Sequence, residues 1–240
     1  MPHSIHPLTA AIREITQIFS KMGFSVADGP ELEDAWHNFD ALNVPKDHPA
    51  RDMQDTFWLS GERVMRTHTS PVQVRWMETN EPPIRIIAPG KVYRNEATDM
   101  THEAQFYQVE GLVIDENASL ANLKGTLSTF FSEFFGGAVE VRFRPSFFPF
   151  TEPSVEVDMR LMGETVPEKL RGRWIEVMGA GMVNPKVLNN VGIDSNRYQG
   201  FAFGAGIERL CMLKWGIDDA RLFHTGDLRL VSQFKTEKEI

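Results

Sequence analysis

The chain has 240 residues, of which 42% are hydrophobic and 24% are charged. This is enough apolar material for one substantial core or two small ones, and a single domain over residues 1–240 is the simplest organisation. No apolar stretch approaches the roughly 18–20 residues that cross a bilayer, and the N-terminus lacks the basic-then-apolar order of a signal peptide. We therefore expect no membrane association and a cytoplasmic location.

Charge and cysteine usage narrow the chemistry further. The formal net charge is −8, the wrong sign for a domain that holds nucleic acid by bulk electrostatics. Any RNA contact must then be local or shared with a partner. The only cysteine, Cys211, lies in an apolar run, so neither a disulfide nor a thiolate metal site can form within the chain, and we expect it in the core.

The N-terminal part predicts a helix, a short strand and a long loop. Apolar residues recur at helical spacing from Leu8 to Met22, and Gly23 ends the series. The segment 24–30 is interpreted as a strand and 31–39 as a second short helix. Residues 42–57 are rich in proline and charge, which predicts a loop long enough to be functional. Within it His48 has no partner pattern, so we expect it to be structural or solvent-facing.

From residue 84 onward the pattern favours strands. Segments 84–88, 92–94 and 105–114 predict an antiparallel hairpin with a polar loop at 95–103. Residues 120–135 have helical spacing and stop at Gly136-Gly137; their phenylalanines Phe130, Phe131, Phe134 and Phe135 are expected in a core or an interface. The remaining predicted elements are strands at 139–144, 154–159, 174–181 and 201–203, an exposed hairpin extension at 163–172, and a closing helix at 206–215.

The order of these elements indicates the fold class. Strands cluster in the middle, helices lie at both ends, and there is little β-α-β alternation. This arrangement predicts an α+β fold in which an antiparallel β-sheet is flanked by helices.

One face of the strand at 105–111 carries a chemical pattern. Alternation places Phe106, Gln108 and Glu110 on the same face. An aromatic ring, an amide and a carboxylate in this order could stack a ring and bind a polar or cationic group beyond it. Taken alone, the pattern is more typical of a solvated sheet face.

A second pattern joins glycines to an arginine. Glycines 200, 204 and 206 allow close backbone approach, and a helix start next to Arg209 is a possible phosphate site. Arg94 ends a strand elsewhere in the chain. Two arginines facing one pocket would suit a triphosphate, although a glycine-rich strand-to-helix turn is by itself a weak signal.

Together these segments resemble the class II aminoacyl-tRNA synthetases. Residues 93–96 with the strand that ends at Gly111 resemble motif 2 of that class, and residues 204–209 resemble motif 3. Residues 23–30 with the preceding helix resemble motif 1, which builds the subunit interface. Segments similar to the phenylalanyl α subunit in particular are 37–42, 67–71, 144–153 and 200–204. The resemblance runs from about Ile5 to Lys235.

The resemblance implies an enzyme, a phenylalanine–tRNA ligase. It implies a catalytic domain that activates phenylalanine with ATP and passes it to tRNA(Phe), together with a β subunit in an α2β2 assembly that self-associates through the motif 1 region. The family's N-terminal helical arm is expected to be missing from residues 1–240. Mg²⁺ and ATP are the implied cofactor and co-substrate.

The resemblance also implies roles for individual residues. Arg94 and Arg209 are the expected catalytic pair, holding the α- and γ-phosphates of ATP. The remaining expected ATP-site residues are Glu96, His102 and Phe106, with Phe106 stacking on adenine. The expected amino-acid site consists of His68, Ser70, Gln73, Gln108 and Glu110 for the ammonium and carboxylate, Phe148 and Phe150 for the ring, and Ala202 and Gly204, which leave space for it. The expected Mg²⁺ ligands are Glu152 and Glu176.

Two other functions remain open from the residues alone. The chain could be a synthetase-like amino-acid-binding or regulatory protein without tRNA charging, although intact Arg94, Glu110 and Arg209 argue against that. It could also be a dimerisation module that is inactive unless assembled.

Overall fold

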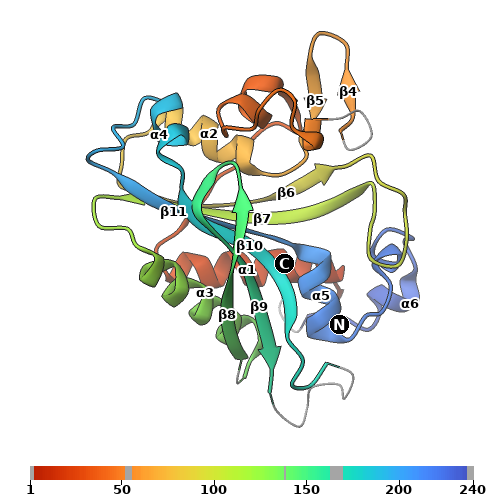
Figure 1. Ribbon diagram of the computed structural model, residues 1–240. Coiled ribbons are helices and arrows are strands. Elements are labelled where there is room, and N and C mark those ends of the chain that lie inside the picture. The colour runs from red at the N-terminus through yellow and green to blue at the C-terminus, as the bar shows by residue number, and fades with distance from the viewer. Residues whose placement is uncertain (1–2, 52–55, 138, 163–169, 237–240) are drawn as a thin grey trace.

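A seven-stranded sheet forms the centre of the molecule (Figure 1). The computed structural model describes residues 3–51, 56–137, 139–162 and 170–236. The strand order is β2-β6-β7-β11-β10-β9-β8. The bounds are Ser25–Val26 for β2, Ile84–Tyr93 for β6, Gln105–Asp115 for β7, Val139–Phe148 for β8, Thr151–Leu161 for β9, Ile175–Val183 for β10 and Gln199–Gly206 for β11. Neighbouring strands are antiparallel except β2, which pairs in parallel with β6. The predicted α+β fold with helices flanking a β-sheet is confirmed.

Two small sheets and several helices complete the described part. The small sheets comprise β3 (Leu32–Asp34), β4 (Trp58–Leu59) and β5 (Arg63–Met65), and β1 (His3–Ser4) with β12 (Lys235–Thr236). The α-helices are α1 (Pro7–Lys21), α2 (Ser70–Thr79), α3 (Leu120–Phe135), α4 (Pro185–Asn190), α5 (Ile207–Trp215) and α6 (Leu228–Val231). A π-helix spans Trp36–Asp40, and 3₁₀-helices span Pro49–Arg51 and Ala220–Phe223.

Helices α1, α3 and α5 pack on one face of the large sheet and form the main core (Figure 1). The ring of Phe19 on α1 stacks on Phe130 of α3 at 4.9 Å and on Phe203 of β11 at 5.4 Å between ring centroids. Phe130, Phe131 and Phe134 are buried, as predicted for a core helix, and so is Cys211. Burial of these rings removes large apolar areas from water and is the main stabilising term on this face.

The opposite face of the sheet carries a second, smaller apolar cluster. Helices α2 and α4 and the π-helix pack there against β6 and β7, with Phe39, Val72, Leu112 and Leu188 among the buried residues. The cavity described below is lined from this same side of the sheet.

Most predicted elements are present, with several differences in extent. The helices at 7–21, 120–135 and 207–215 and the hairpin of β6 and β7 are confirmed. Strand β6 continues through Pro89-Gly90, where a break was expected, and 32–34 form a strand where a helix was expected. Helices α2 and α4 were not predicted. Of the predicted hairpin extension at 163–172, residues 163–169 lie outside the described residues.

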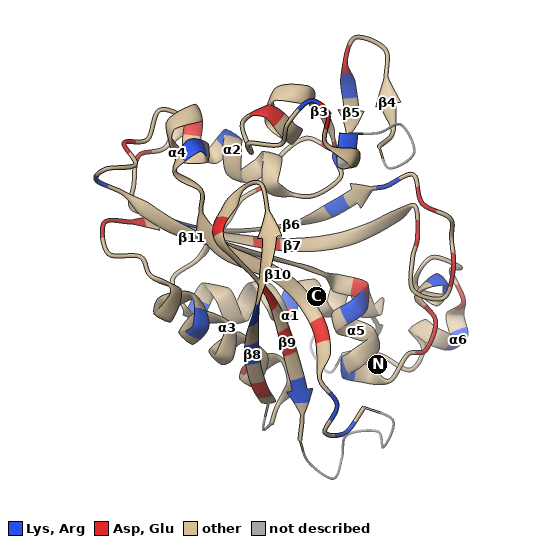
Figure 2. Cartoon of the chain, viewed as in Figure 1, with Lys and Arg blue, Asp and Glu red and all other residues tan. Residues whose placement is uncertain are grey.

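Charged residues of both signs are interspersed along the chain (Figure 2). None of the helices in the described ranges is both long enough and apolar enough to cross a membrane.

Candidate active site

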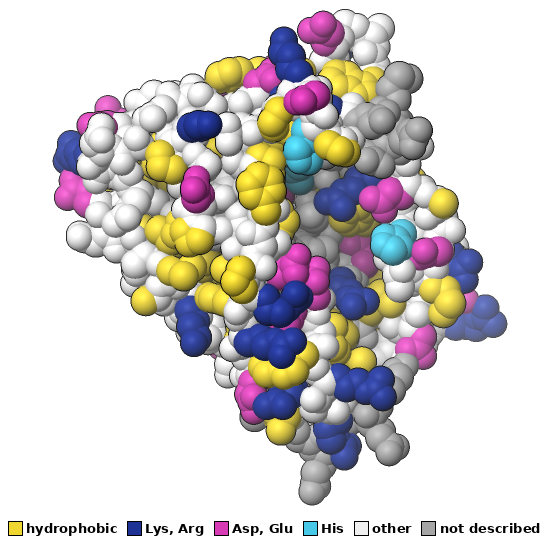
Figure 3. Space-filling model, viewed as in Figure 1, with side chains coloured by type: hydrophobic (Ala, Val, Ile, Leu, Met, Phe, Trp, Pro, Cys, Tyr) yellow, Lys and Arg dark blue, Asp and Glu magenta, His cyan; other side chains and the backbone are white. Residues whose placement is uncertain are grey.

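A cavity of about 570 Å³ opens on the sheet face that carries α2. Its walls come from α2, β7, the β8–β9 hairpin, β10 and β11, and from residues 39–48. Figure 3 shows the molecule hollowed near the middle of this view, with acidic, basic and hydrophobic side chains around the hollow. A volume of this size is typical of sites for small molecules.

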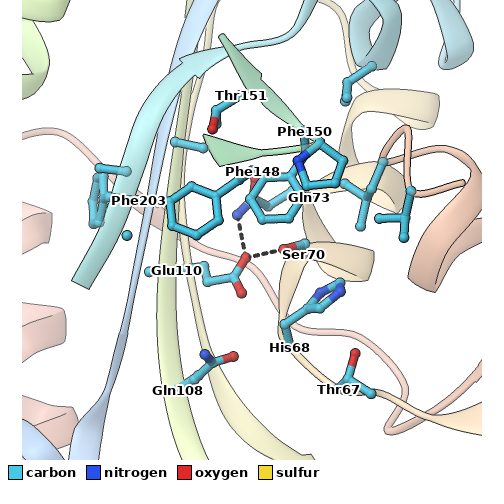
Figure 4. Close-up of a pocket in the computed structure, with 18 of the residues that line it drawn as sticks. Thr67, His68, Ser70, Gln73, Gln108, Glu110, Phe148, Phe150, Thr151 and Phe203 are labelled. Atoms are coloured by element: carbon cyan, nitrogen blue, oxygen red, sulfur yellow. Dashed lines mark hydrogen bonds between the residues drawn. The ribbon is translucent and has the colours of Figure 1, made fainter. Parts of the chain in front are cut away.

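Glu110 is the buried carboxylate at the centre of this cavity (Figure 4). Its two oxygens accept hydrogen bonds from the Thr69 amide (3.1 Å), the Ser70 hydroxyl (2.5 Å) and the Gln73 amide (2.8 Å). Burial raises the pKa of Glu110 to about 7, while the bonds from Ser70 and Thr69 and the positive charge of Arg94 oppose the rise. Near pH 7 the carboxyl group is therefore only partly ionised, and a bound cation would stabilise its ionised form.

Two buried polar atoms of cavity-lining residues have no hydrogen-bond partner among the described residues. They are Oε1 of Gln108 and Nδ1 of His68, both buried in residues that line the cavity. Burial, aided by the charges of Arg94 and Arg66, lowers the pKa of His68 to about 3, so its imidazole is neutral at pH 7. Since buried polar atoms in native proteins nearly always have partners, these two atoms are available to a polar group that enters the cavity.

Aromatic rings form another wall of the cavity. The rings of Phe148 and Phe150 are nearly parallel, 5.7 Å apart between centroids, and His68 lies 6.4 Å from Phe150. Phe148 fits because Gly179 lies beneath it: a Cβ on Gly179 would come within 2.9 Å of the Phe148 ring. Ala202 also lines this space, and its small side chain leaves room for an aromatic ligand.

The position of the Glu110 side chain requires a glycine at residue 204. The two residues face each other across β7 and β11, and a Cβ on Gly204 would lie 2.9 Å from Cγ of Glu110. Real Cβ atoms almost never come so close, so glycine at this position lets the carboxylate lie flat against β11. The sequence suggested that Gly204 leaves space for the substrate ring. Gly204 does line the cavity, and its missing side chain also makes room for Glu110, so its role toward the ring stays a prediction.

Arg94 reaches the cavity from the end of β6. Its Nε donates to the Thr67 carbonyl at 3.2 Å, and its guanidinium lies 5.1 Å from the centre of the Phe106 ring. Thr67 is itself fixed by Asn38 of the π-helix, which donates to the Thr67 hydroxyl at 3.1 Å. The predicted motif 2 residues are therefore held together by side chains that are distant in sequence.

Arg209 lies in the first turn of α5, where β11 ends. The neighbouring Glu208 accepts hydrogen bonds from the Tyr107 amide at 3.0 Å, which fixes the start of α5 against the strand that carries Phe106 and Gln108. Arg209 is exposed and makes no ion pair with another described residue. Its guanidinium is available to an anion beside the Phe106 strand.

The remaining predicted residues divide between the cavity and its surroundings. Glu96 and Glu176 line the cavity, and Glu176 pairs with Arg144 at 3.1 Å. His102 is exposed in the β6–β7 loop, where it pairs with Asp99 at 3.0 Å. Glu152 is exposed. Glu176 pairs across the sheet with Asp158, and Glu152 lies six residues before Asp158 on β9. At the usual rise per strand residue, the two glutamates are therefore roughly 20 Å apart. The structure does not bring Glu152 and Glu176 to one ion.

Several site residues were not found from the sequence. Gly179 supports Phe148, and the amide of Thr69 is a donor to Glu110. Their roles depend on cross-strand and tertiary contacts, which leave no local signal. His48 was expected to be structural or solvent-facing, but it lines the cavity. It follows closely after residues 37–42, which resemble the phenylalanyl α subunit, and this proximity in sequence could have indicated its position.

The fold and the paired motifs define a class II synthetase catalytic core. A family model for the class II core domain of tRNA synthetases, type F, matches residues 1–234. A solved structure with this architecture is the pyrrolysyl-tRNA synthetase of Desulfitobacterium hafniense. It has a TM-score of 0.70 and 18% identity, and the match covers 97% of this chain and 77% of that one; a likeness at this identity concerns the fold alone.

Curated relatives narrow the family. The chain is 56% identical to a phenylalanine–tRNA ligase alpha subunit of Dehalococcoides mccartyi over 240 residues, a match that covers 96% of this chain and 69% of the relative. The proteins of the same name from Azotobacter vinelandii (55% identity, 96% and 69% covered) and Klebsiella pneumoniae (56%, 96% and 68%) are similar. The chain belongs to the class II tRNA synthetase core family and, within it, to the phenylalanine–tRNA ligase α subunits, as the sequence motifs predicted.

Proposed function

We propose that this chain activates phenylalanine with ATP to phenylalanyl-adenylate and transfers it to tRNA(Phe). The observation that carries the proposal is the composition of the cavity. An aromatic wall of Phe148 and Phe150 lies in the same space as the buried Glu110 carboxylate, and Arg94 points into it. A ring, an ammonium and a phosphate are the three groups of an aromatic aminoacyl-adenylate.

The amino-acid end of the substrate fits the polar part of the cavity. The ammonium would pair with Glu110 and donate to the unpaired Oε1 of Gln108. Ser70 and Gln73 hold the carboxylate of Glu110 in place through the bonds given above. The ring would then lie against Phe148 and Phe150. Fixing both ends of the amino acid leaves its own carboxylate directed toward Arg94.

Activation would need positioning and charge rather than a nucleophile from the protein. A carboxylate oxygen of phenylalanine attacks the α-phosphorus of ATP, and pyrophosphate leaves. Arg94, anchored by the Thr67 carbonyl, would stabilise charge on the α-phosphate, and Arg209 would hold the γ-phosphate. Phe106 would stack on adenine.

Mg²⁺ would be held on the side of the cavity lined by Glu176. Carboxylate oxygens are the ligands that Mg²⁺ prefers, and Glu176 fits because it lines the cavity and shares Arg144 with Glu156, another lining carboxylate. Glu152 does not fit, because it is exposed away from the cavity. When bound, Mg²⁺ would neutralise phosphate charge.

The cavity would reject tyrosine by leaving its hydroxyl without a partner. Leu112, Val183 and Val187 line the space along with the aromatic wall. An unpaired buried hydroxyl costs roughly 1–3 kcal/mol, which corresponds to about 10–200-fold discrimination. Higher accuracy would have to come from a second site.

The partners implied by the α-subunit relatives are tRNA(Phe) and a β subunit. Self-association would use the motif 1 region, where β2 is a sheet edge and Val26 is 47% exposed. We prefer an enzyme to a purely regulatory amino-acid-binding protein, because Arg94 lines the amino-acid cavity and Arg209 is retained, exposed, in the first turn of α5 after β11, the strand that pairs with β7.

The test is phenylalanine-dependent exchange of pyrophosphate into ATP by the chain assembled with the β subunit. We expect exchange with phenylalanine and a rate at least tenfold lower with tyrosine. Absence of exchange with phenylalanine, while calorimetry still detects phenylalanine binding, would support the regulatory alternative.

A further inference from the structure

Phe147 is the most exposed aromatic residue in the described ranges. Its exposed fraction is 79%, against 41% for Trp36, the next most exposed. It is one of the residues that line the cavity, as are the charged residues Glu156 and Glu176. None of the roles assigned above uses it.

The backbone of the β8–β9 hairpin directs this ring outward. Ser146 pairs with Ser154, but Phe148 pairs with Thr151, so the register is irregular at Phe147. The Phe148 amide is held by the Ser154 hydroxyl at 3.0 Å, which turns the Phe148 ring into the cavity. Its neighbour Phe147, near the end of β8, is left largely exposed to solvent.

The surroundings of Phe147 do not resemble an apolar protein interface. Ser146 bonds to Glu156 at 3.0 Å, and Arg144 pairs with Glu156 at 2.9 Å and with Glu176 at 3.1 Å. Arg144 is held by these carboxylates, so the described surroundings offer no free positive charge for a phosphate. The exposed flat ring is therefore the group suited to contact a nucleoside, by stacking on its base.

The second half-reaction brings a nucleoside to this opening. When phenylalanyl-adenylate fills the cavity, the terminal ribose hydroxyl of the acceptor RNA attacks the activated carbonyl carbon, and AMP leaves. The ester bond forms as the bond between the carbonyl carbon and the phosphate oxygen breaks, and the hydroxyl proton passes to a phosphate oxygen of the leaving AMP. With a net charge of −8, the chain has little bulk attraction for RNA, so a local contact has to fix the last nucleoside.

We propose that Phe147 is a positioning residue that stacks on the base of the 3′-terminal nucleoside of the acceptor RNA during transfer. The proposal rests on the proposed function and adds a residue that acts in the second half-reaction, the transfer to RNA. Loss of the aromatic ring on which a base stacks weakens nucleic-acid binding by about 5- to 150-fold. The effect should appear in transfer and not in activation.

The experiment compares two rates in the chain assembled with the β subunit. Pyrophosphate exchange reports activation, and single-turnover transfer from preformed phenylalanyl-adenylate reports the RNA step. For Phe147→Ala and Phe147→Leu we expect transfer to fall about tenfold while exchange changes less than twofold. Phe147→Trp should retain transfer, because it keeps a flat ring. Leu228→Ala, at a site that is 78% exposed on α6, is the matched control and should change neither rate.

Three results would overturn the proposal. Equal loss of exchange and transfer would place Phe147 in the amino-acid site, and unchanged transfer would make it an ordinary surface residue. Loss of co-elution with the β subunit would make it a subunit contact. If the wild-type assembly shows no exchange at all, the proposed function fails instead, which is a separate outcome.

Discussion

Replacement of Glu110 by glutamine tests the part of the cavity assigned to the substrate ammonium. The side chain keeps its size, so Phe148 and Gly204 need not move. The negative charge is lost, however, and one oxygen that accepts from Ser70 and Gln73 becomes an NH₂ donor or forces the amide to turn.

Two magnitudes follow from the pKa of Glu110. Its value of about 7, against 4.5 for an ordinary glutamate, means that the folded protein binds more protons than the unfolded chain between these pH values. Stability is therefore full below about pH 4.5 and falls as pH rises through 7, by roughly 3 kcal/mol in total for a shift of about 2.5 units. Glu110→Gln should remove this fall.

Phenylalanine binding should show the opposite dependence on pH. The ammonium needs the carboxylate form of Glu110, so affinity should fall about tenfold for each pH unit below 7 and level off above it. His68 stays neutral over this range, because its pKa is about 3. In Glu110→Gln, the affinity should be about 10- to 150-fold weaker at pH 8 and independent of pH.

The assay is calorimetric titration with phenylalanine between pH 5.5 and 8.5, in buffers of different ionisation enthalpy so that proton release is counted. Glu133→Gln, which alters an exposed carboxylate paired with Lys21 on the far helices, is the control. A wild-type affinity that does not change between pH 6 and 8, or a pH slope that survives in Glu110→Gln, would refute the reasoning.

Three further substitutions test the cavity, the phosphate site and the core. Gly179→Ala should weaken phenylalanine binding at least tenfold with ATP binding unchanged, since its Cβ would come within 2.9 Å of Phe148; equal affinities by calorimetry would contradict this. Arg209→Ala should lower kcat/KM for ATP in pyrophosphate exchange by about 10²–10³, whereas Arg229→Ala, whose side chain is 91% exposed, should have almost no effect; similar rates in both variants would refute the phosphate role. Leu127→Ala, at a fully buried position of α3, should cost about 2–5 kcal/mol in urea unfolding, and a loss below 1 kcal/mol would argue against its place in the core.

Long periodic elements were predictable from the sequence. Helix α3 has one apolar face and a glycine at its C-terminus, so its bounds agree with the prediction. Helix α2 was missed because its first five residues, Ser70 to Val74, are all buried, so no single apolar face repeats at helical spacing. Burial on several sides by other elements is a tertiary property that the local pattern does not carry.

The continuity of strand β6 also depends on tertiary structure. Pro89-Gly90 indicated a break, but β6 pairs with β2 only at Ile86 and Ile87, so no strand pairs with β6 at Pro89 on that side. The Tyr93 amide faces away from β7, toward the Arg66 carbonyl, and by alternation the nitrogen of Pro89 faces the same way. A proline without an N–H is tolerated on such an edge.

The candidate site was predictable where residue type and motif coincided. Alternation alone placed Phe106, Gln108 and Glu110 on one face, and the structure sets Gln108 and Glu110 in the cavity wall. The roles of Gly179 and the Thr69 amide arise from contacts across the sheet and between distant segments, so no spacing rule could identify them.

The central claim is that one cavity holds the ring, the ammonium and the phosphate of phenylalanyl-adenylate. A crystal structure with a non-hydrolysable sulfamoyl analogue of this adenylate tests it most directly. We expect the ring against Phe148 and Phe150, the ammonium within hydrogen-bond distance of Glu110, and the sulfamoyl group beside Arg94. An analogue bound with its ring elsewhere, or with its ammonium turned away from Glu110, would contradict it.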